Sequence, residues 1–116
     1  MGVQTKRIYD NVELEDGHRV LVMTYWPRGV KKEKIDEWAR KLGTPADLIQ
    51  QWKEDQISWK DFSEQYLRSI EDDKDKLKEL AKLAESKPVT LLCSCKDEEH
   101  CHRSLLKQLI EEMRGE

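Results

Sequence analysis

Residues 89–106 read VTLLCSCKDEEHCHRSLL, and this stretch decides the fold. Its first five residues, Val89–Cys93, form a short apolar run that starts with β-branched side chains, which predicts a buried strand. A polar loop follows and leads into a run with helical spacing, which predicts a final helix beginning near Cys101. The apolar face of that helix consists of Leu105, Leu106, Leu109, Ile110 and Met113.

The loop between this strand and this helix holds all three cysteines of the chain and two of its three histidines. Thiols and imidazoles are candidate nucleophiles and soft or borderline metal ligands. Arg103 adds a guanidinium at the same place. The residue types therefore form a site-like group, although they do not name a reaction.

The N-terminal part of the chain predicts a β-hairpin. Ile8–Leu14 shows a loose alternation typical of a strand, and the Asp16-Gly17 pair that follows is a strong hairpin turn signal. Arg19–Trp26 is rich in β-forming apolar residues, and Pro27 ends it because proline cannot donate a ladder hydrogen bond. We expect two strands joined by a tight turn here.

Between the hairpin and the last strand, four runs show the spacing of amphipathic helices. The first covers residues 32–43, the second starts at Thr44, and Ser58 caps the third. Residues 72–75 separate the third run from the fourth. The apolar positions of the four runs are Ile35, Trp38, Ala39 and Leu42; Leu48, Ile49 and Trp52; Trp59, Phe62, Tyr66 and Ile70; and Leu77, Leu80, Ala81 and Ala84.

Together these elements predict an α/β fold, with a small mixed sheet of about three or more strands packed by about four to five helices. The long connection between the second and third strands should cross over the sheet and make them parallel neighbours. Ligands of such sheets bind beyond the carboxyl ends of the parallel strands. The loops Trp26–Gly29 and Cys93–Arg103 both emerge there, so we expect them to converge.

Length and charge narrow the class of protein. The 116 residues suit a single α/β domain, residues 1–116, with one modest core. The 21 Lys and Arg and the 24 Asp and Glu leave a net charge of -3, which argues against nucleic acid as a partner. No segment approaches the roughly 20 apolar residues of a membrane span, and the N-terminus lacks the apolar core of a signal peptide. We expect a cytoplasmic protein with no membrane partner, and no pattern indicates an oligomeric state.

A metal site is one hypothesis for the loop, because clustered cysteines in the cytoplasm are more often reduced, reactive or metal-bound than disulfide-bonded. Cys93, Cys95 and Cys101 supply three ligands, and His102 or His100 a fourth, which suits tetrahedral zinc or an iron–sulfur centre. The spacing argues against it, since structural zinc motifs favour two ligand pairs separated by a dozen or more residues. A metal-binding or redox-sensing protein is therefore the less favoured alternative.

The favoured hypothesis is a thiol-bearing anion site. A helix N-terminus and nearby cations stabilise thiolates and bind anions, and Cys101 stands next to His102 and Arg103 at the predicted start of the helix. We expect Cys93 or Cys101 to be the reactive thiol and His102 its proton partner. Arg28 and Arg103 would clamp a small anionic or phosphate-bearing ligand. Whether the protein is an enzyme stays open.

Trp26, Gly29 and Ser104 complete the expected ligand-binding residues, as members of the same two loops. Trp26 lies where an aromatic ligand could stack, although ordinary packing is the favoured interpretation of its side chain. Cys93 ends a buried strand, so a plain core role is as well supported for it as a reactive one. A nucleic-acid accessory role for Trp26 and the two arginines is a further alternative, against which the net charge argues.

Three motifs of the chain resemble the domain-of-unknown-function 488 (DUF488) family: Trp26–Gly29, Leu91–Cys93 and Cys101–Leu106. The resemblance runs over nearly the whole chain. The Trp-Pro-Arg-Gly loop and the aromatic residues of the third helical run are similar to the YeaO-like branch of that family. The resemblance implies a compact α/β domain and no settled activity.

The chain departs from the family pattern at two places. Members usually carry an Asp followed closely by an Arg before the proline loop, where this chain has Met23-Thr24, and many have a Glu where this chain has Cys95. The missing carboxylates weaken an acid–base mechanism, and the added thiol strengthens a metal or redox hypothesis. The triplet Cys101–Arg103 is often absent from the YeaO-like branch, so the chain combines features of two branches.

Overall fold

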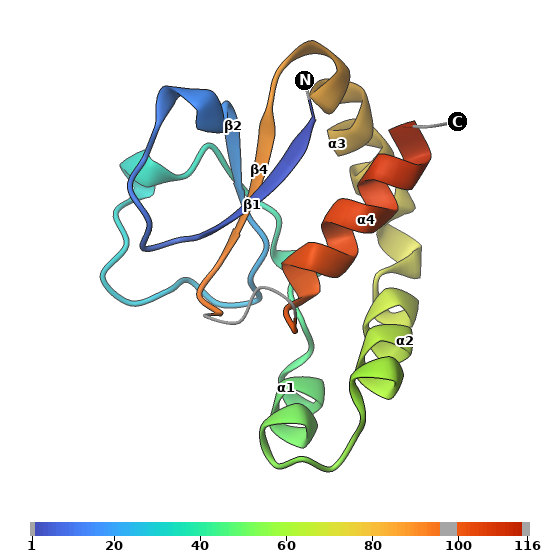
Figure 1. Ribbon diagram of the computed structural model, residues 1–116. Helices are drawn as coiled ribbons and strands as arrows, with labels where there is room; N and C mark the ends of the chain where they lie inside the picture. Colours follow the sequence, from blue (N-terminus) through green and yellow to red (C-terminus); the bar gives the residue numbers. More distant parts are fainter. Residues whose placement is uncertain (1, 96–99, 115–116) are drawn as a thin grey trace.

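Four strands form the central sheet, and all of their pairings are parallel. The computed structural model describes residues 2–95 and 100–114. Within these ranges the strand order is β1-β4-β2-β3, so that the last strand in the chain lies between the first two (Figure 1). The strands are β1 (Val3–Arg7), β2 (His18–Leu21), β3 (Glu37–Trp38) and β4 (Val89–Cys93).

Strand β4 organises the sheet, because it pairs with β1 on one side and with β2 on the other. Val89 lies opposite Val3 of β1 and also opposite His18 of β2. All five residues of β4 are buried, as expected for a parallel strand covered on both faces. The predicted buried strand at Val89–Cys93 and its parallel pairing with the second strand are both confirmed.

Helices cover one face of this sheet. α3 and α4 pack together against it, and α1 and α2 extend beyond the end at which β4 finishes (Figure 1). α2 begins where the sequence predicts, since the Ser58 side chain accepts a hydrogen bond from the backbone N–H of Asp61 at 3.1 Å. Within the described ranges the α-helices are α1 (Ala46–Lys53), α2 (Trp59–Ser69), α3 (Lys74–Ser86) and α4 (His102–Arg114).

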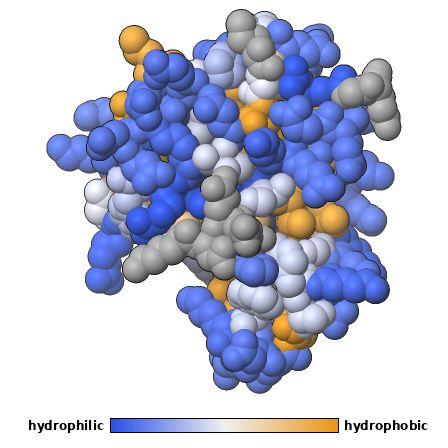
Figure 2. Space-filling view, viewed as in Figure 1, coloured by the Kyte–Doolittle hydropathy of each residue, from blue (hydrophilic) through white to orange (hydrophobic). Residues whose placement is uncertain are grey.

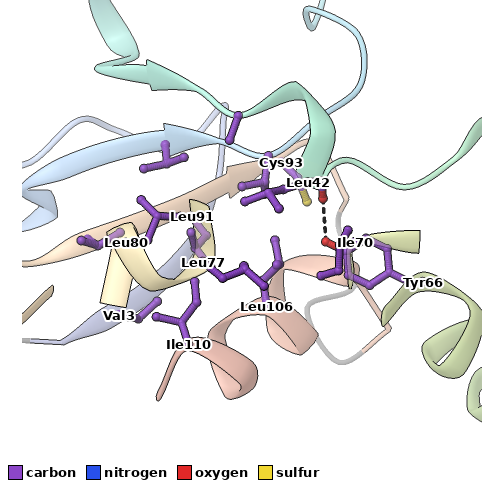
Figure 3. Packing of buried hydrophobic residues seen from close by; sticks show 14 of the residues in the cluster. Val3, Leu42, Tyr66, Ile70, Leu77, Leu80, Leu91, Cys93, Leu106 and Ile110 are labelled. Carbon is purple, nitrogen blue, oxygen red and sulfur yellow. Dashed lines mark hydrogen bonds between the residues drawn. The ribbon is translucent and has the colours of Figure 1, made fainter. Parts of the chain in front are cut away.

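The two faces of the sheet are covered differently. On the helical face, apolar side chains of α2, α3 and α4 meet those of the strands, and the Tyr66 hydroxyl donates to the backbone carbonyl of Leu42 at 2.6 Å (Figure 3). On the other face, Ile8, Leu21 and Leu92 form a smaller cluster. Side chains from the connection after β2 cover that cluster in place of a helix: Met23, Trp26, Val30, Ile35 and Trp38.

The predicted N-terminal hairpin is wrong, although the α/β class is confirmed. β1 lies at Val3–Arg7 rather than at Ile8–Leu14, and it does not pair with β2, because both strands flank β4. The Asp16-Gly17 pair does form a turn, but it leads from a short 3-10 turn into β2, which ends at Leu21. Alternation alone cannot distinguish two strands of a hairpin from two strands that both pair with a third. The described sheet is therefore parallel rather than mixed.

The predicted helix over residues 32–43 is also wrong. The segment contains the short strand β3 between two 3-10 turns. Its apolar residues serve two separate clusters, since Ile35 and Trp38 cover the face without helices whereas Ala39 and Leu42 lie in the main core. Four residues that point to two faces of a sheet can share helical spacing by coincidence, and the pairing of β3 with β2 outweighs helix propensity here.

The surface matches a chain in which 39% of the residues are charged. Figure 2 shows that hydrophilic residues cover most of one face and that hydrophobic residues are exposed there in separate small patches. Among the residues that the structure describes, no helix is long and apolar enough to cross a membrane.

Candidate functional site

Three sulfur atoms and one ring nitrogen gather where β4 ends and α4 begins. Cys93 is the last residue of β4, Cys95 follows two positions later, Cys101 directly precedes α4, and His102 is its first residue. One ligand atom from each of these four side chains lies within 4.8 Å of all the others. We call these four residues the Cys/His cluster. Residues 96–99 of the predicted loop lie outside the described residues.

The three thiols of the cluster differ in burial. Cys93 and Cys101 are each 1% exposed, and their Sγ atoms lie 2.9 Å apart as free thiols. The Cys101 Sγ atom is also 3.8 Å from Nδ1 of His102. Cys95 is exposed, so it is the thiol that a reagent or an ion in solution meets first.

The orientation of His102 is fixed by a backbone group on another element. Its Nε2 atom hydrogen-bonds the carbonyl oxygen of Val22, the residue directly after β2. A carbonyl oxygen only accepts hydrogen bonds, so Nε2 carries the proton and donates. In the neutral imidazole the lone pair is then on Nδ1, the atom that faces Cys101. A second partner of this kind is what holds the histidine ligands of metal sites in place.

Arg103 supports the cluster from within the protein. Its side chain is buried, and its Nη1 donates to the backbone carbonyls of Lys6 at 3.1 Å and Cys93 at 3.4 Å. The same nitrogen lies 3.4 Å from the Cys93 Sγ atom. These contacts join β1, β4 and α4, and they place a positive charge beside a sulfur atom, which favours its thiolate form.

The pKa values of the three thiols of the cluster are shifted in different directions. Hydrogen bonds from Cys101, Cys93 and His102 lower the pKa of Cys95. Hydrogen bonds with Cys93 and Cys95, together with burial, raise the pKa of Cys101. The contact with Cys101 lowers the pKa of Cys93, but Cys95 and burial outweigh it and raise that pKa to about 11. The arrangement therefore favours the thiolate form at the exposed cysteine and the protonated form at the two buried ones.

A pocket of about 640 Å³ adjoins the cluster. It lies between the cluster on β4 and α4, the connection after β2, and the helices α1 and α2. The described residues that line it are mostly apolar or aromatic and include no Asp or Glu. They are Met23, Thr24, Tyr25, Thr44, Ile49, Trp52, Lys53, Phe62, Cys93, Ser94, Cys95, His100, Cys101 and His102.

The structure brings some of the predicted site residues together and leaves others apart. The predicted thiols and His102 meet in the cluster, and Arg103 contacts Cys93. Ser104 lies in the first turn of α4, where its backbone N–H donates to the Cys101 carbonyl at 3.1 Å. His100 is exposed, and its ring lies against Trp52 with 5.7 Å between ring centroids.

The predicted convergence of the two loops takes place through other residues than expected. The connection after β2 reaches the pocket at Met23–Tyr25, whereas Trp26, Arg28 and Gly29 are not among the described lining residues. The Trp26 indole donates to the Val30 carbonyl at 2.8 Å and packs edge-on against a neighbouring tryptophan. Arg28 is exposed, and its backbone carbonyl accepts a hydrogen bond from a tyrosine hydroxyl.

Several residues around the cluster could not be assigned to it from the sequence. Trp52 and Phe62 form part of the pocket wall, although helical spacing indicates only packing for them. Tyr66 lies with its ring 5.4 Å from the His102 ring, and burial, with smaller contributions from two thiols, raises its pKa well above the usual value. Thr44 and Lys53 carry no sequence signal, because only the placement of α1 brings them to the pocket.

The comparisons with known proteins agree with the motifs. The family model described as the active DUF488-N3 subclade matches residues 3–114. The chain is 36% identical over 108 residues to the uncharacterized protein YeaO of Escherichia coli (strain K12), which covers 91% of this chain and 94% of YeaO. It is 26% identical over 110 residues to the uncharacterized protein Rv3073c of Mycobacterium tuberculosis, which covers 93% and 92% of the two chains. No solved structure matches the chain.

The match spans nearly all of the described residues, including the strands, the helices and the Cys/His cluster. The motifs that first indicated the family all lie inside it, from Trp26–Gly29 to Cys101–Leu106. The resemblance drawn from the sequence is thereby confirmed, and the chain belongs to the DUF488 family, within the DUF488-N3 subclade.

Proposed function

We propose that this protein binds one soft divalent metal ion, zinc by preference, through the Cys/His cluster. The observation that carries the proposal is the gathering of three Sγ atoms and one ring nitrogen within 4.8 Å of one another. Three thiolates and one imidazole form one of the common ligand sets of structural zinc. The orientation of His102 adds to this, since its Nδ1 lone pair is directed by the bond from Nε2 to the Val22 carbonyl.

The dimensions of the cluster suit a single ion. With Zn–S bonds of about 2.3 Å, the ligand atoms of a tetrahedral site lie about 3.8 Å apart. The Sγ atoms of Cys93 and Cys101 lie 2.9 Å apart, and all four ligand atoms lie within 4.8 Å of one another. Small side-chain adjustments would therefore bring the four atoms around one ion. Iron–sulfur clusters are typically held by four cysteines, whereas the chain contains three, which favours zinc.

The spacing objection from the sequence loses its force once the fold is known. Spacing rules describe ligands on two short loops that are separated by other structure. Here the ligands come from the end of β4, from Cys95, and from the start of α4, and the sheet itself brings β4 and α4 together. The bond from His102 to Val22 attaches this start of α4 to the connection after β2.

Metal analysis of protein purified without an affinity tag or chelators tests the proposal. We expect one zinc ion per chain after exposure to stoichiometric zinc and desalting, and thiol titration should show protection of the cysteines until a chelator removes the ion. Protein that retains no zinc and keeps three thiols freely titratable in the presence of zinc would rule the proposal out.

A second function has its own supporting observation, the pocket of about 640 Å³ whose lining includes the three cysteines of the cluster. We propose that this pocket holds a small anionic ligand beside the thiols. Cys95 would supply the reactive thiol, with His102 as its proton partner, because Cys95 is exposed and its pKa is lowered. The predicted Cys93 and Cys101 are buried and their pKa values are raised, which disfavours a reactive role for them. Arg103 is committed to backbone carbonyls, and Arg28 is not among the described lining residues. Among those residues, Lys53 is the Lys or Arg available to the ligand in place of the two predicted arginines.

Alkylation of the metal-free protein by iodoacetamide at graded pH tests the thiol part of this second proposal. We expect one thiol to react at a pH well below the usual thiol pKa, and peptide mapping identifies it. Equal reaction of all three cysteines, with apparent pKa values near ~8.5 as for free cysteine, would remove the thiol chemistry and leave the metal proposal standing.

A further inference from the structure

We infer that the pocket beside the Cys/His cluster takes a small planar aromatic acid, with its ring against Trp52 and Phe62 and its carboxylate toward Lys53. The inference rests on the second proposal above, that the pocket holds a small anionic ligand, and it names the class of that ligand. None of these three side chains belongs to the cluster, so binding of the acid does not require the metal ion.

Ring contacts hold the aromatic wall together, and part of it lines the pocket. The rings of Trp52 and Phe62 both line the pocket, with 5.9 Å between their centroids and an angle of 55° between their planes. Trp59 stacks on Phe62 at 4.8 Å and supports it from outside the pocket lining. A ligand ring that enters can therefore make offset or edge-on contacts with a surface that needs no reordering.

The mouth of the pocket exposes further apolar surface. Tyr25 is 67% exposed and Ile49 is 37% exposed, and both line the pocket. Exposed large apolar side chains gathered at a cavity mark a binding surface more often than scattered ones do. The volume of about 640 Å³ lies within the range in which proteins bind small molecules, and it accommodates one or two fused rings with a carboxylate.

The charges around the pocket favour an anion at one position. Lys53 lies at the end of α1 and is exposed, and no Asp or Glu occurs among the described lining residues. The sulfur atoms of the cluster come from other elements, β4 and the segment before α4. Lys53 is the only Lys or Arg among the described lining residues, so the carboxylate is assigned to it and the ring to the aromatic wall.

The wall of the pocket also contains a polar group without a partner. The Thr44 side chain is 3% exposed, and its hydroxyl has no hydrogen-bond partner among the described residues. Buried hydroxyls without a partner are rare in folded proteins. The hydroxyl is also closed off from solvent, so an oxygen or nitrogen atom on the ligand ring reaches it when the Thr44 side chain rotates toward the pocket. We expect the acid to carry such a group on its ring.

Calorimetric titration of the tag-free protein with three probes tests the inference. The probes are 6-hydroxy-2-naphthoate, the neutral 2-naphthalenemethanol, and cyclohexanecarboxylate, an anion without an aromatic ring. We expect the naphthoate to bind most tightly, about tenfold more tightly than cyclohexanecarboxylate, because aromatic contacts add to apolar burial. Equal affinity for cyclohexanecarboxylate would overturn the aromatic class and leave a general anion pocket. Equal affinity for the neutral alcohol would show that the negative charge of the ligand does not contribute to binding, and it would overturn the inference that the ligand is an anion.

Two variants and a matched control locate the site. We expect Lys53→Gln to weaken naphthoate binding by about threefold, as for an exposed ion pair, whereas Lys78→Gln on the exposed side of α3 leaves it unchanged. Trp52→Leu keeps apolar bulk and should weaken naphthoate more than cyclohexanecarboxylate. Equal effects of Lys53→Gln and Lys78→Gln, or absence of naphthoate binding in a correctly folded protein, would overturn the inference. Zinc content measured on the same samples shows separately whether the metal proposal holds.

Discussion

His102 and Val22 are joined by a hydrogen bond from the imidazole Nε2 to the backbone carbonyl, across 80 positions of the chain. The bond attaches the first residue of α4 to the residue that follows β2. Because the acceptor is a backbone atom on a strand end, no side-chain substitution at position 22 removes it. The orientation of the histidine is thus a property of the sheet.

The two histidines at this place should differ sharply in their effect on zinc. His102→Gln removes the Nδ1 ligand and should lower zinc affinity by about tenfold to a hundredfold or more. His100→Gln alters a neighbouring exposed histidine that lines the pocket but lies outside the cluster, and should leave zinc affinity unchanged. Competition with a chromogenic chelator measures both. A loss of affinity in His100→Gln equal to that in His102→Gln would show that the wrong histidine has been assigned.

Serine substitutions at two cysteines of the cluster should both weaken zinc binding but should differ in their effect on the free energy of unfolding. Cys95 is exposed, so Cys95→Ser should change the free energy of unfolding of the metal-free protein by no more than about 0.5 kcal/mol. Cys93 is buried at the end of β4, and Cys93→Ser places a hydroxyl among apolar groups, which should cost about 1–3 kcal/mol. Both variants should bind zinc more weakly. Urea unfolding in the presence of a chelator gives the first quantity and zinc competition the second; unaltered zinc affinity in Cys95→Ser would exclude it as a ligand.

The buried carboxylate of Asp16 should control stability in acid. Asp16 is 2% exposed and pairs with Arg19, and its carboxylate lies 3.1 Å from the Lys6 ammonium group. Burial raises the pKa of Asp16, but hydrogen bonds from Glu13, Lys6 and Arg19 outweigh burial and lower it below 3.8. Because the pKa of Asp16 is lower in the folded state, its carboxylate stabilises the protein at pH values above 3.8. This stabilisation is lost as the pH falls from 3.8 through the lower pKa of the folded state.

Asp16→Asn should therefore lower the free energy of unfolding at pH 7 by about 3–5 kcal/mol, because Arg19 is left buried without its counter-charge. The variant should also lose less stability than the wild type between about pH 5 and pH 3. Urea unfolding across that range measures both effects. The matched control is Asp55→Asn, an exposed position whose φ of 55° asparagine tolerates. If the free energy of unfolding fell equally with decreasing pH in the wild type and in Asp16→Asn, the acid sensitivity could not be assigned to Asp16.

Two glycines with positive φ should respond differently to alanine. Gly17 has φ of 63°, and a Cβ atom there would lie 2.2 Å from the Pro88 carbonyl oxygen. Gly29 has φ of 77°, but a Cβ atom there meets nothing within 4 Å. Gly29→Ala should cost about 1–2 kcal/mol from backbone strain alone. Gly17→Ala adds a clash with the Pro88 backbone to the strain of its own positive φ, so it should destabilise clearly more. Thermal unfolding compares the two variants, and equal costs would contradict the close approach.

The elements that the sequence predicts well are those in which one local pattern has one interpretation. The stripe of α2, with Phe62 and Tyr66 buried, follows from helical spacing and a serine cap, and β4 follows from a run that is apolar throughout. The hairpin fails because the turn signal at Asp16-Gly17 is real while its partner strand is distant in sequence. The helix over residues 32–43 fails because its apolar residues divide between the two faces of the sheet.

The residues of the candidate site also divide into those that the sequence predicts and those that only the structure reveals. The thiols and His102 can be predicted, because they are adjacent in the chain and their chemistry is distinctive. Arg28 could not be placed from the sequence, since its distance from the pocket depends on how the connection after β2 turns back to cover the second face. Lys53 and Thr44 are ordinary residue types, and only the three-dimensional arrangement of α1 gives them a place beside the cluster.

The position of β4 between β1 and β2 also sets the order in which the chain can fold during synthesis. β1 and β2 emerge from the ribosome early, yet neither has the other as a partner. The edges of β1 and β2 that face β4 stay unpaired until residues 89–93 have been made, although β2 pairs on its other edge with β3. Until then the nascent chain passes through a stage in which these two strand edges are open to other chains.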